Sequence, residues 1–178
     1  NNLVYDPLST IAVGIEVVLG GASTMAPKIY HNTIYGANTL QGSGETGISI
    51  YRDAGTCSPE IKYNNITNWS CFGIENEWNN PGTPVVGSNN VWNNYCDEFE
   101  GSAIGATDIS ADPDYVDPAA GNFDLASGSP SIDAVALTSG DPVTVDLLGR
   151  GRPANDGFDM GCYESTGTAN RPPAQPVV

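Results

Sequence analysis

Three segments of this chain repeat one pattern. PKIYHNTI begins at Pro27, PEIKYNNI at Pro59 and PVVGSNNV at Pro84. Each consists of Pro, any residue, Ile or Val, two variable residues, Asn, one variable residue, and again Ile or Val. A repeat of 20 to 50 residues indicates that the chain builds the same structural unit several times.

A second element recurs at nearly the same step. GIEV begins at Gly14, GISI at Gly47 and GIEN at Gly73, with apolar residues alternating at period two and no helical periodicity. Each unit therefore contains short strands, and short strands bury their apolar side only if successive units stack in parallel, ~4.8 Å apart. We predict an all-β fold, a parallel β-helix (a solenoid) over residues 1–105. The alternative is a β-sandwich in which three similar Asn turns coincide.

Stacking places equivalent residues above one another. It aligns Asn32, Asn64 and Asn89, whose amides would form an internal ladder. It also aligns Cys71 with Cys96, and a backbone spacing of ~4.8 Å suits a disulfide. Cys57 and Cys162 are able to pair only if the last segment folds back over the coil. Because Asn1-Asn2-Leu3 matches Asn64-Asn65-Ile66, we expect the chain to begin partway through a repeat, as an N-terminally truncated solenoid.

Charge and composition limit the partners. The chain has 178 residues and a formal net charge of −15, so nucleic acid and anionic membranes are not expected as partners. No apolar run approaches the ~20 residues that a membrane span needs, so membrane insertion is not expected either. The even cysteine count and two N-glycosylation sequons, at Asn65 and Asn68, favour a secreted protein.

After Gly101 the repeat ends and the sequence consists of a different set of short motifs. Its pieces are DPDYVDP from Asp112, FDL from Phe123, GSPSIDA from Gly128, DLLGRGRP from Asp146 and DMGCYE from Asp159. This string resembles the C-terminal module of secreted right-handed parallel β-helix proteins, of the type found before a choice-of-anchor cell-surface segment. The preceding repeats resemble the pectate-lyase-like superfamily at the level of the fold. Cys162 departs from the pattern, which has a small residue there.

The resemblance implies a role for this module in covering the helix. Residues 106–164 are expected to cap the last coil, because the end of a solenoid exposes unpaired strand edges and an open core. Residues 165–178 are rich in proline and are expected to be a linker to a further domain or anchor. Four apolar side chains are expected on the capped end: Phe123, Leu125, Ile132 and Tyr163.

Candidate catalytic residues follow from the same resemblance. Lyases of this fold use Lys or Arg to remove a proton beside a uronate. The candidates here are Lys28, His31, Arg52, Asp53 and Lys62, although Lys28 and Lys62 do not stack. A hydrolase needs paired carboxylates. Aligned carboxylates occur at Glu16, Glu75 and Glu100, either as a solvated face or as a place to hold a cation.

Binding residues of two other kinds are present. The aromatic residues Trp69, Trp78 and Trp92, together with Tyr30, Tyr35 and Tyr51, are candidates for stacking on a sugar, or else pack within loops. No cofactor is expected, apart from a calcium ion that Asp112, Asp114 and Asp117 have the oxygen ligands to bind.

Two functions follow. The favoured one is a structural or adhesive β-helix segment of a secreted, extracellular or cell-surface protein, which contacts a polysaccharide or cell-wall glycan and associates end to end. The alternative is the C-terminal part of a polysaccharide lyase or glycoside hydrolase.

Overall fold

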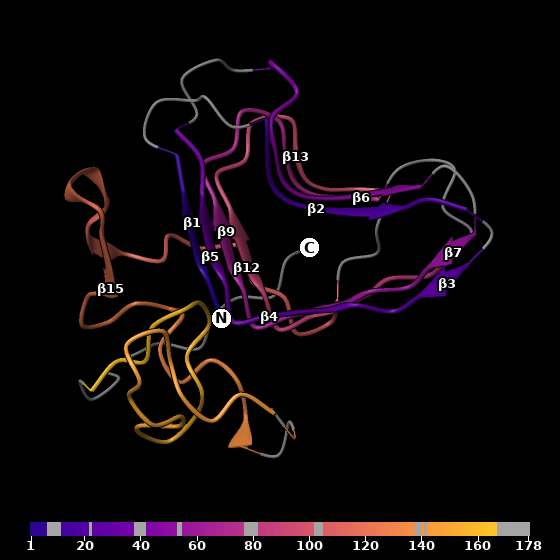
Figure 1. The fold of residues 1–178 in the computed structure, drawn as a ribbon. Coiled ribbons are helices and arrows are strands. Elements are labelled where there is room, and N and C mark those ends of the chain that lie inside the picture. The colour runs from indigo at the N-terminus through magenta and orange to yellow at the C-terminus, as the bar shows by residue number, and fades with distance from the viewer. Residues whose placement is uncertain are drawn as a thin grey trace.

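The computed structural model describes residues 1–6, 12–21, 23–37, 42–52, 55–76, 82–101, 105–137, 140 and 142–166. These residues form an all-β structure dominated by parallel strands (Figure 1). Asp53, Trp78 and nearly all of the proposed linker lie outside the described residues.

Sheet 1 contains the strands β1 (Leu3–Tyr5), β5 (Thr33–Tyr35), β9 (Asn65–Thr67) and β12 (Asn90–Trp92), in that order. All neighbours are parallel, and the register aligns Ile34 with Ile66 and Ile66 with Val91. These three side chains are fully buried. The last apolar position of the PKIYHNTI repeat is therefore an interior column, as the sequence predicts.

Sheet 2 contains β2 (Val13–Leu19), β6 (Thr46–Arg52), β10 (Phe72–Asn76) and β13 (Asp97–Glu100), and sheet 3 contains β4 (Lys28–Tyr30), β8 (Glu60–Lys62) and β11 (Val85–Gly87). Both are parallel throughout. A parallel pair, β3 (Thr24–Met25) with β7 (Thr56–Cys57), follows sheet 2 along the chain.

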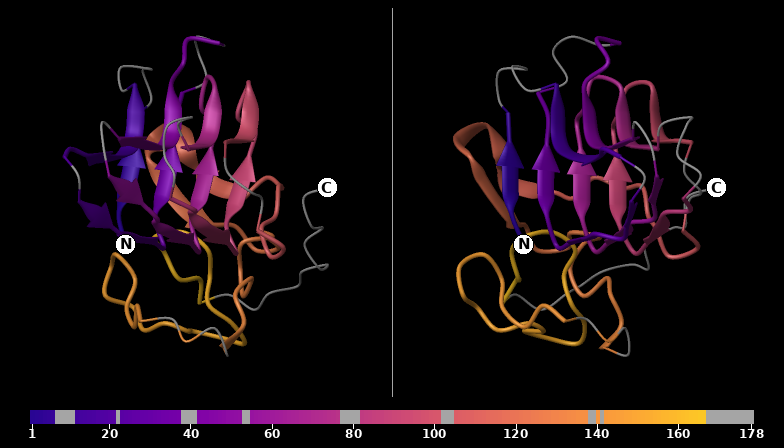
Figure 2. Two further views of the ribbon diagram at one scale, coloured as in Figure 1. Left: turned by 90° about the vertical axis from the view of Figure 1, so that its right-hand side faces the viewer. Right: turned by 45° about the vertical axis from the view of Figure 1, so that its right-hand side comes forward.

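The chain visits the sheets in a fixed order. From β4 it passes to β5 in sheet 1 and β6 in sheet 2, then returns to sheet 3 as β8 and repeats the circuit. We call one such circuit a coil. Figure 2 shows the sheet 1 strands of successive coils standing side by side. Parallel strands in stacked sheets are compatible with the predicted parallel β-helix.

Glycines allow sheets 1 and 2 to meet at a tight corner. A Cβ added to Gly47 would lie 2.5 Å from Ile66 Cγ2 and 2.6 Å from the Gly73 carbonyl oxygen. Gly14 and Gly73 are equally confined. The indole of Trp69 fills this corner against the glycines and is only 1% exposed. The repeated Gly is thus required by the close approach of successive coils.

Polar side chains also stack inside the coils. Asn32 Nδ2 donates to Asn64 Oδ1 and Asn64 Nδ2 donates to Asn89 Oδ1, each at 2.8 Å. The three asparagines are buried and form the predicted ladder. The structure extends it by one residue, because Asn89 Nδ2 donates to Asp108 Oδ1 at 3.0 Å.

The predicted disulfide between Cys71 and Cys96 is confirmed, with a Cα–Cα distance of 4.3 Å. It joins the segments that lead into β10 and β13. Cys57 and Cys162 do not form a disulfide; both side chains are buried, and burial raises the pKa of each thiol.

The C-terminal module lies along the side of the coils. It contains β14 (Tyr115–Asp117), the short 3-10 helix η1 (Pro118–Ala120) and β15 (Asn122–Leu125), with β14 and β15 antiparallel. Only residues 105–109 continue the last coil, where Ile109 forms a parallel bridge with Asn90. The following segments run past the whole row of sheet 1 strands (Figure 2).

The prediction that Phe123 covers the last coil is therefore wrong. Its ring packs against Tyr5 and Tyr35, which belong to the first two strands of sheet 1, at centroid distances of 5.0 and 5.1 Å. The outward face of sheet 1 carries aromatic and buried polar side chains along its whole length, and the module packs against this face.

Among the described residues, no helix has the length and apolar character to cross a membrane.

Candidate functional site

A column of side chains runs across the outward face of sheet 1. The register aligns Tyr5 with Tyr35, Tyr35 with Thr67, and Thr67 with Trp92. Since side chains alternate along a strand, these residues point away from the buried Ile34 column beside them. The column therefore presents aromatic side chains at three of four successive strands.

A cleft of about 280 Å³ opens between this column and the C-terminal module. Trp92 and Tyr35 form part of one wall, and Asp112 and Asp114 belong to the module on the other side. Asn68 and Asn93 complete a polar edge, where Asn93 Nδ2 donates to Asn68 Oδ1 at 2.7 Å. Both asparagines have left-handed backbone angles, which Asn tolerates better than most residues.

Two buried hydroxyls lie beneath the cleft. Thr67 Oγ1 and Tyr115 Oη are shielded from solvent, and neither completes a hydrogen bond of good geometry, although they lie close to each other. Burial raises the pKa of Tyr115, so its phenol stays protonated and keeps a proton to donate. A buried hydroxyl without a partner costs free energy, and a bound polar group is one way to recover it.

A second cleft, of about 290 Å³, adjoins the first. It is lined by Tyr5, Ala37 and Ala119 and shares Tyr35 and Pro118 with the first cleft. Phe123 packs edge-on against Tyr35 and Tyr115, with ring centroids 5.1 Å apart in both pairs. The module thus packs its own aromatic rings against the Tyr5 and Tyr35 end of the column.

The predicted sugar-stacking residues occupy different places in the fold. Tyr35 lines both clefts, whereas Tyr30 is buried. Trp92 is half-buried in the first cleft. Trp69 is interior, and its Nε1 donates to the Ile34 carbonyl oxygen at 3.3 Å, so the prediction is wrong for this residue. Tyr51 is exposed but belongs to β6 in sheet 2, and Trp78 lies outside the described residues.

The calcium site predicted at Asp112, Asp114 and Asp117 is not assembled. Asp112 Oδ1 accepts the Asp114 backbone N–H at 3.0 Å, and Asp117 Oδ1 accepts the Ala120 N–H at 3.2 Å. These carboxylates shape turns of the backbone. Within the described ranges, no group of three or more His, Cys, Asp or Glu side chains is placed to hold a metal ion.

Three of the catalytic candidates, Lys28, His31 and Lys62, lie on or next to the neighbouring strands β4 and β8. Lys62 Nζ pairs with Glu60 Oε2 at 3.2 Å, and Tyr30 donates its hydroxyl to the same oxygen. That hydrogen bond from Tyr30 and then the one from Lys62 lower the pKa of Glu60. Lys28 is exposed and lies beside Glu60 in the register, so Lys28 and Lys62 do not align. The backbone of Arg52 pairs with Leu19, while Asp53 falls outside the described residues.

His31 does not have the exposure of a catalytic base. Its side chain is fully buried, and Nδ1 donates to the Asp159 carbonyl oxygen at 3.1 Å. The predicted column of Glu16, Glu75 and Glu100 does align, through Ser49 on β6. Glu75 accepts a hydrogen bond from Thr46 Oγ1 at 3.2 Å, and Glu16 is exposed.

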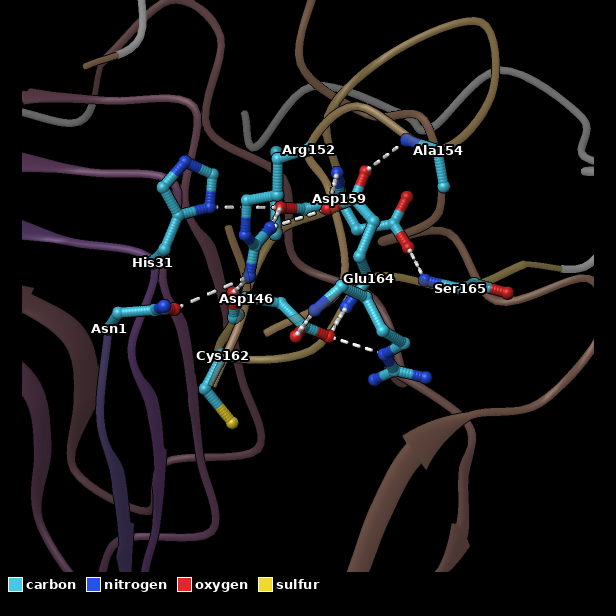
Figure 3. Close-up of polar contacts among 12 residues, drawn as sticks. Asn1, His31, Asp146, Arg152, Ala154, Asp159, Cys162, Glu164 and Ser165 are labelled. Carbon is cyan, nitrogen blue, oxygen red and sulfur yellow. Dashed lines mark hydrogen bonds and ion pairs between the residues drawn. The ribbon is translucent and has the colours of Figure 1, made fainter. Parts of the chain in front are cut away.

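A buried polar cluster lies within the module and contacts His31 and Asn1 of the coils (Figure 3). Arg152 Nη1 donates to Glu164 Oε2 at 2.6 Å, and Nη2 donates to the Gly161 carbonyl oxygen at 2.7 Å. Both charged side chains are almost entirely buried. Burial raises the pKa of Asp159 to about 6, and burial and then the charge of Asp159 raise the pKa of Glu164.

Direct hydrogen bonds join the same module to three strands. The Cys162 N–H donates to Thr33 Oγ1 on β5, Asn65 Nδ2 on β9 donates to the Met160 carbonyl oxygen, and Asn90 Nδ2 on β12 donates to Ser131 Oγ. Asn65 is fully buried by these contacts, so the sequon at Asn65 is closed in the folded protein.

Sequence reasoning missed the cleft. The signal was present, since Tyr35, Thr67 and Trp92 each follow the last apolar residue of a repeat and must share one outward column. The module side of the cleft carried no such signal, because residues 112–118 belong to no repeat.

Comparison with known proteins adds no relative: no family model, curated protein sequence or solved structure matches this chain.

Proposed function

We propose that this chain is a structural and adhesive segment of an extracellular or cell-surface protein, folded as a right-handed parallel β-helix. The main observation in support is the C-terminal module, which is hydrogen-bonded to three strands of sheet 1 through buried side chains. Such a brace ties successive coils together laterally. A mechanical segment needs that coupling, because in a stacked-repeat protein each repeat otherwise contacts only its neighbours.

Two further observations support this proposal. The Cys71–Cys96 disulfide joins adjacent coils and is typical of proteins that fold in an oxidising compartment. His31 and Lys62, which a lyase would need free, are already engaged with Asp159 and Glu60. The resemblance of residues 112–164 to a choice-of-anchor module fits attachment to a cell surface.

The test measures two things together: whether the protein is retained on a polysaccharide, and whether it cleaves that polysaccharide. The chain is incubated with insoluble polysaccharides and sedimented, while the supernatant is assayed for new reducing ends and unsaturated uronates. We expect retention without products. Products whose formation is lost in Lys62→Ala would overturn the proposal in favour of the C-terminal part of a lyase or hydrolase. A parallel measurement of molar mass in solution determines whether copies associate end to end.

A further inference from the structure

We propose that the two adjoining clefts form a binding groove for an uncharged polysaccharide chain, with Trp92 as its principal stacking residue. This inference rests on the proposed adhesive function and gives it a location. We define the groove by Trp92, Tyr35 and Tyr5 on sheet 1 and by Asp112, Asp114 and Pro118 on the module.

The geometry of the aromatic column suits a chain of sugar rings. Tyr35 and Trp92 are two strands apart in sheet 1, which corresponds to about 9.6 Å along the stack. This is close to the length of two hexose units. Sugar rings two units apart along the polysaccharide would therefore stack on Tyr35 and Trp92. The side chain of Thr67 between them is short and leaves room for the linkage.

The polar groups suit hydroxyl ligands. Asp112 and Asp114 are exposed carboxylates whose oxygens accept hydrogen bonds, and the amides of Asn68 and Asn93 accept and donate. A ligand site typically combines apolar walls with a few polar groups of this kind.

Charge selects the class of polysaccharide. None of the described residues that line the two clefts is Lys or Arg, whereas two are Asp. The chain as a whole has a net charge of −15. A polyuronate would therefore be repelled from the groove and would lack a cation to pair with, while an uncharged glycan would not.

The experiment measures binding of cellohexaose, xylohexaose and mannohexaose by isothermal titration calorimetry, with hexagalacturonate as the acidic comparison. At least one neutral hexaose is expected to bind, and hexagalacturonate is not. Trp92→Ala is expected to weaken binding about tenfold or more, from the loss of one stacking face. Trp92→Phe is expected to restore part of it. Asp112→Asn and Asp114→Asn test the polar wall of the groove, because each removes a carboxylate and keeps a side chain that is able to form the same backbone turn. Each should weaken binding severalfold.

The matched control is Tyr95→Ala. Tyr95 is 54% exposed, lies three residues from Trp92 and is absent from both clefts, so this variant should bind as the unchanged chain does. Circular dichroism and thermal unfolding establish that each variant is folded.

Equal binding by folded Trp92→Ala and the unchanged chain would overturn the groove while leaving the adhesive function intact. Failure of all three neutral hexaoses to bind at millimolar concentration would overturn the groove, and absence of retention on every insoluble polysaccharide would overturn the adhesive function as well. Cleavage of a hexaose would overturn the adhesive function separately.

Discussion

The asparagine ladder places polar residues in the interior because each amide bonds its counterpart in the next coil. Asn64 illustrates this at full burial: its Nδ2 donates to Asn89 Oδ1 and to the Ile29 carbonyl oxygen, and its Oδ1 accepts from Asn32. A single buried amide without such partners would be costly. The ladder therefore specifies register as well as contributing stability.

Replacement of Asn64 by Ala should destabilise the fold strongly. The change leaves Asn32 without its acceptor and several buried groups without partners, for a loss of about 3 kcal/mol in the free energy of unfolding. Asn2→Ala is the control, because Asn2 is exposed and bonds Asn32 Oδ1 at the outer end of the ladder, and it should cost less than about 1 kcal/mol. Urea denaturation compares the two. Similar losses would show that the buried ladder has no special role.

Glu98 makes a pH-dependent contribution to the free energy of unfolding. Burial raises its pKa to about 7, against the hydrogen bond that it accepts from Asn94 at 2.5 Å. The folded state therefore binds the proton more tightly than the unfolded chain, whose Glu titrates at about 4.3. The resulting stabilisation is complete below about pH 4 and is lost as the pH rises through 7, by roughly 1 to 2 kcal/mol after solvent screening.

In Glu98→Gln this loss should disappear. The difference in unfolding free energy between the variant and the unchanged chain is measured from pH 4 to pH 8, and it should change in favour of the variant as the pH rises. Glu16→Gln removes the same charge from an exposed position on β2 and serves as control. Parallel pH profiles for Glu98→Gln and the unchanged chain would contradict the assignment.

At the scale of the strand, glycine marks the places where coils come closest. Gly47→Ala would place a methyl group 2.6 Å from the Gly73 carbonyl oxygen, which is backbone and cannot rotate away. We expect a loss of at least about 2 kcal/mol in unfolding free energy. Gly20→Ala is the matched control, because nothing lies within 4 Å of the added Cβ. Thermal unfolding of both variants tests this, and equal melting temperatures would refute it.

The strands could be predicted wherever the repeat was intact. The alignment of PKIYHNTI with PEIKYNNI gave the register of Ile29 with Ile61 and of Ile34 with Ile66, and the 25-residue step gave the Cys71–Cys96 disulfide. Those contacts follow from sequence because equivalent residues in stacked units must be neighbours. The outward aromatic column was contained in the same alignment.

The remaining contacts depend on residues outside any repeat. Trp69 resembles an exposed loop residue in sequence, yet it is interior, since Gly14, Gly36 and Gly47 leave a space of indole size at the corner. The position of the C-terminal module depends on complementarity with a whole face of sheet 1. Periodicity describes one strand at a time and carries no information on that surface.

At the scale of the whole molecule, a buried ion pair within the module supports the segment that contacts the coils. Arg152 has a fully buried side chain and bonds Glu164 and two backbone carbonyl groups, while the Gly161 N–H donates to the Tyr63 carbonyl oxygen at 2.8 Å. A buried pair is costly to form, but removal of one partner leaves the other charged and desolvated. The pair therefore makes docking of the module sensitive to either residue.

Arg152→Met should release the module. The variant leaves Glu164 and Asp159 buried without a cation, for an expected loss of about 3 to 5 kcal/mol. Hydrogen exchange of the Gly161 amide reports local release, and urea denaturation reports the total. Arg152→Met with Glu164→Leu should recover part of the loss, because Glu164 is then no longer left buried without its cation. Arg150→Met, which removes a partly exposed partner of Asp146 and Asp124, is the control and should cost about 1 kcal/mol. If Arg152→Met leaves the Gly161 amide as protected as in the unchanged chain, the ion pair does not hold the module in place.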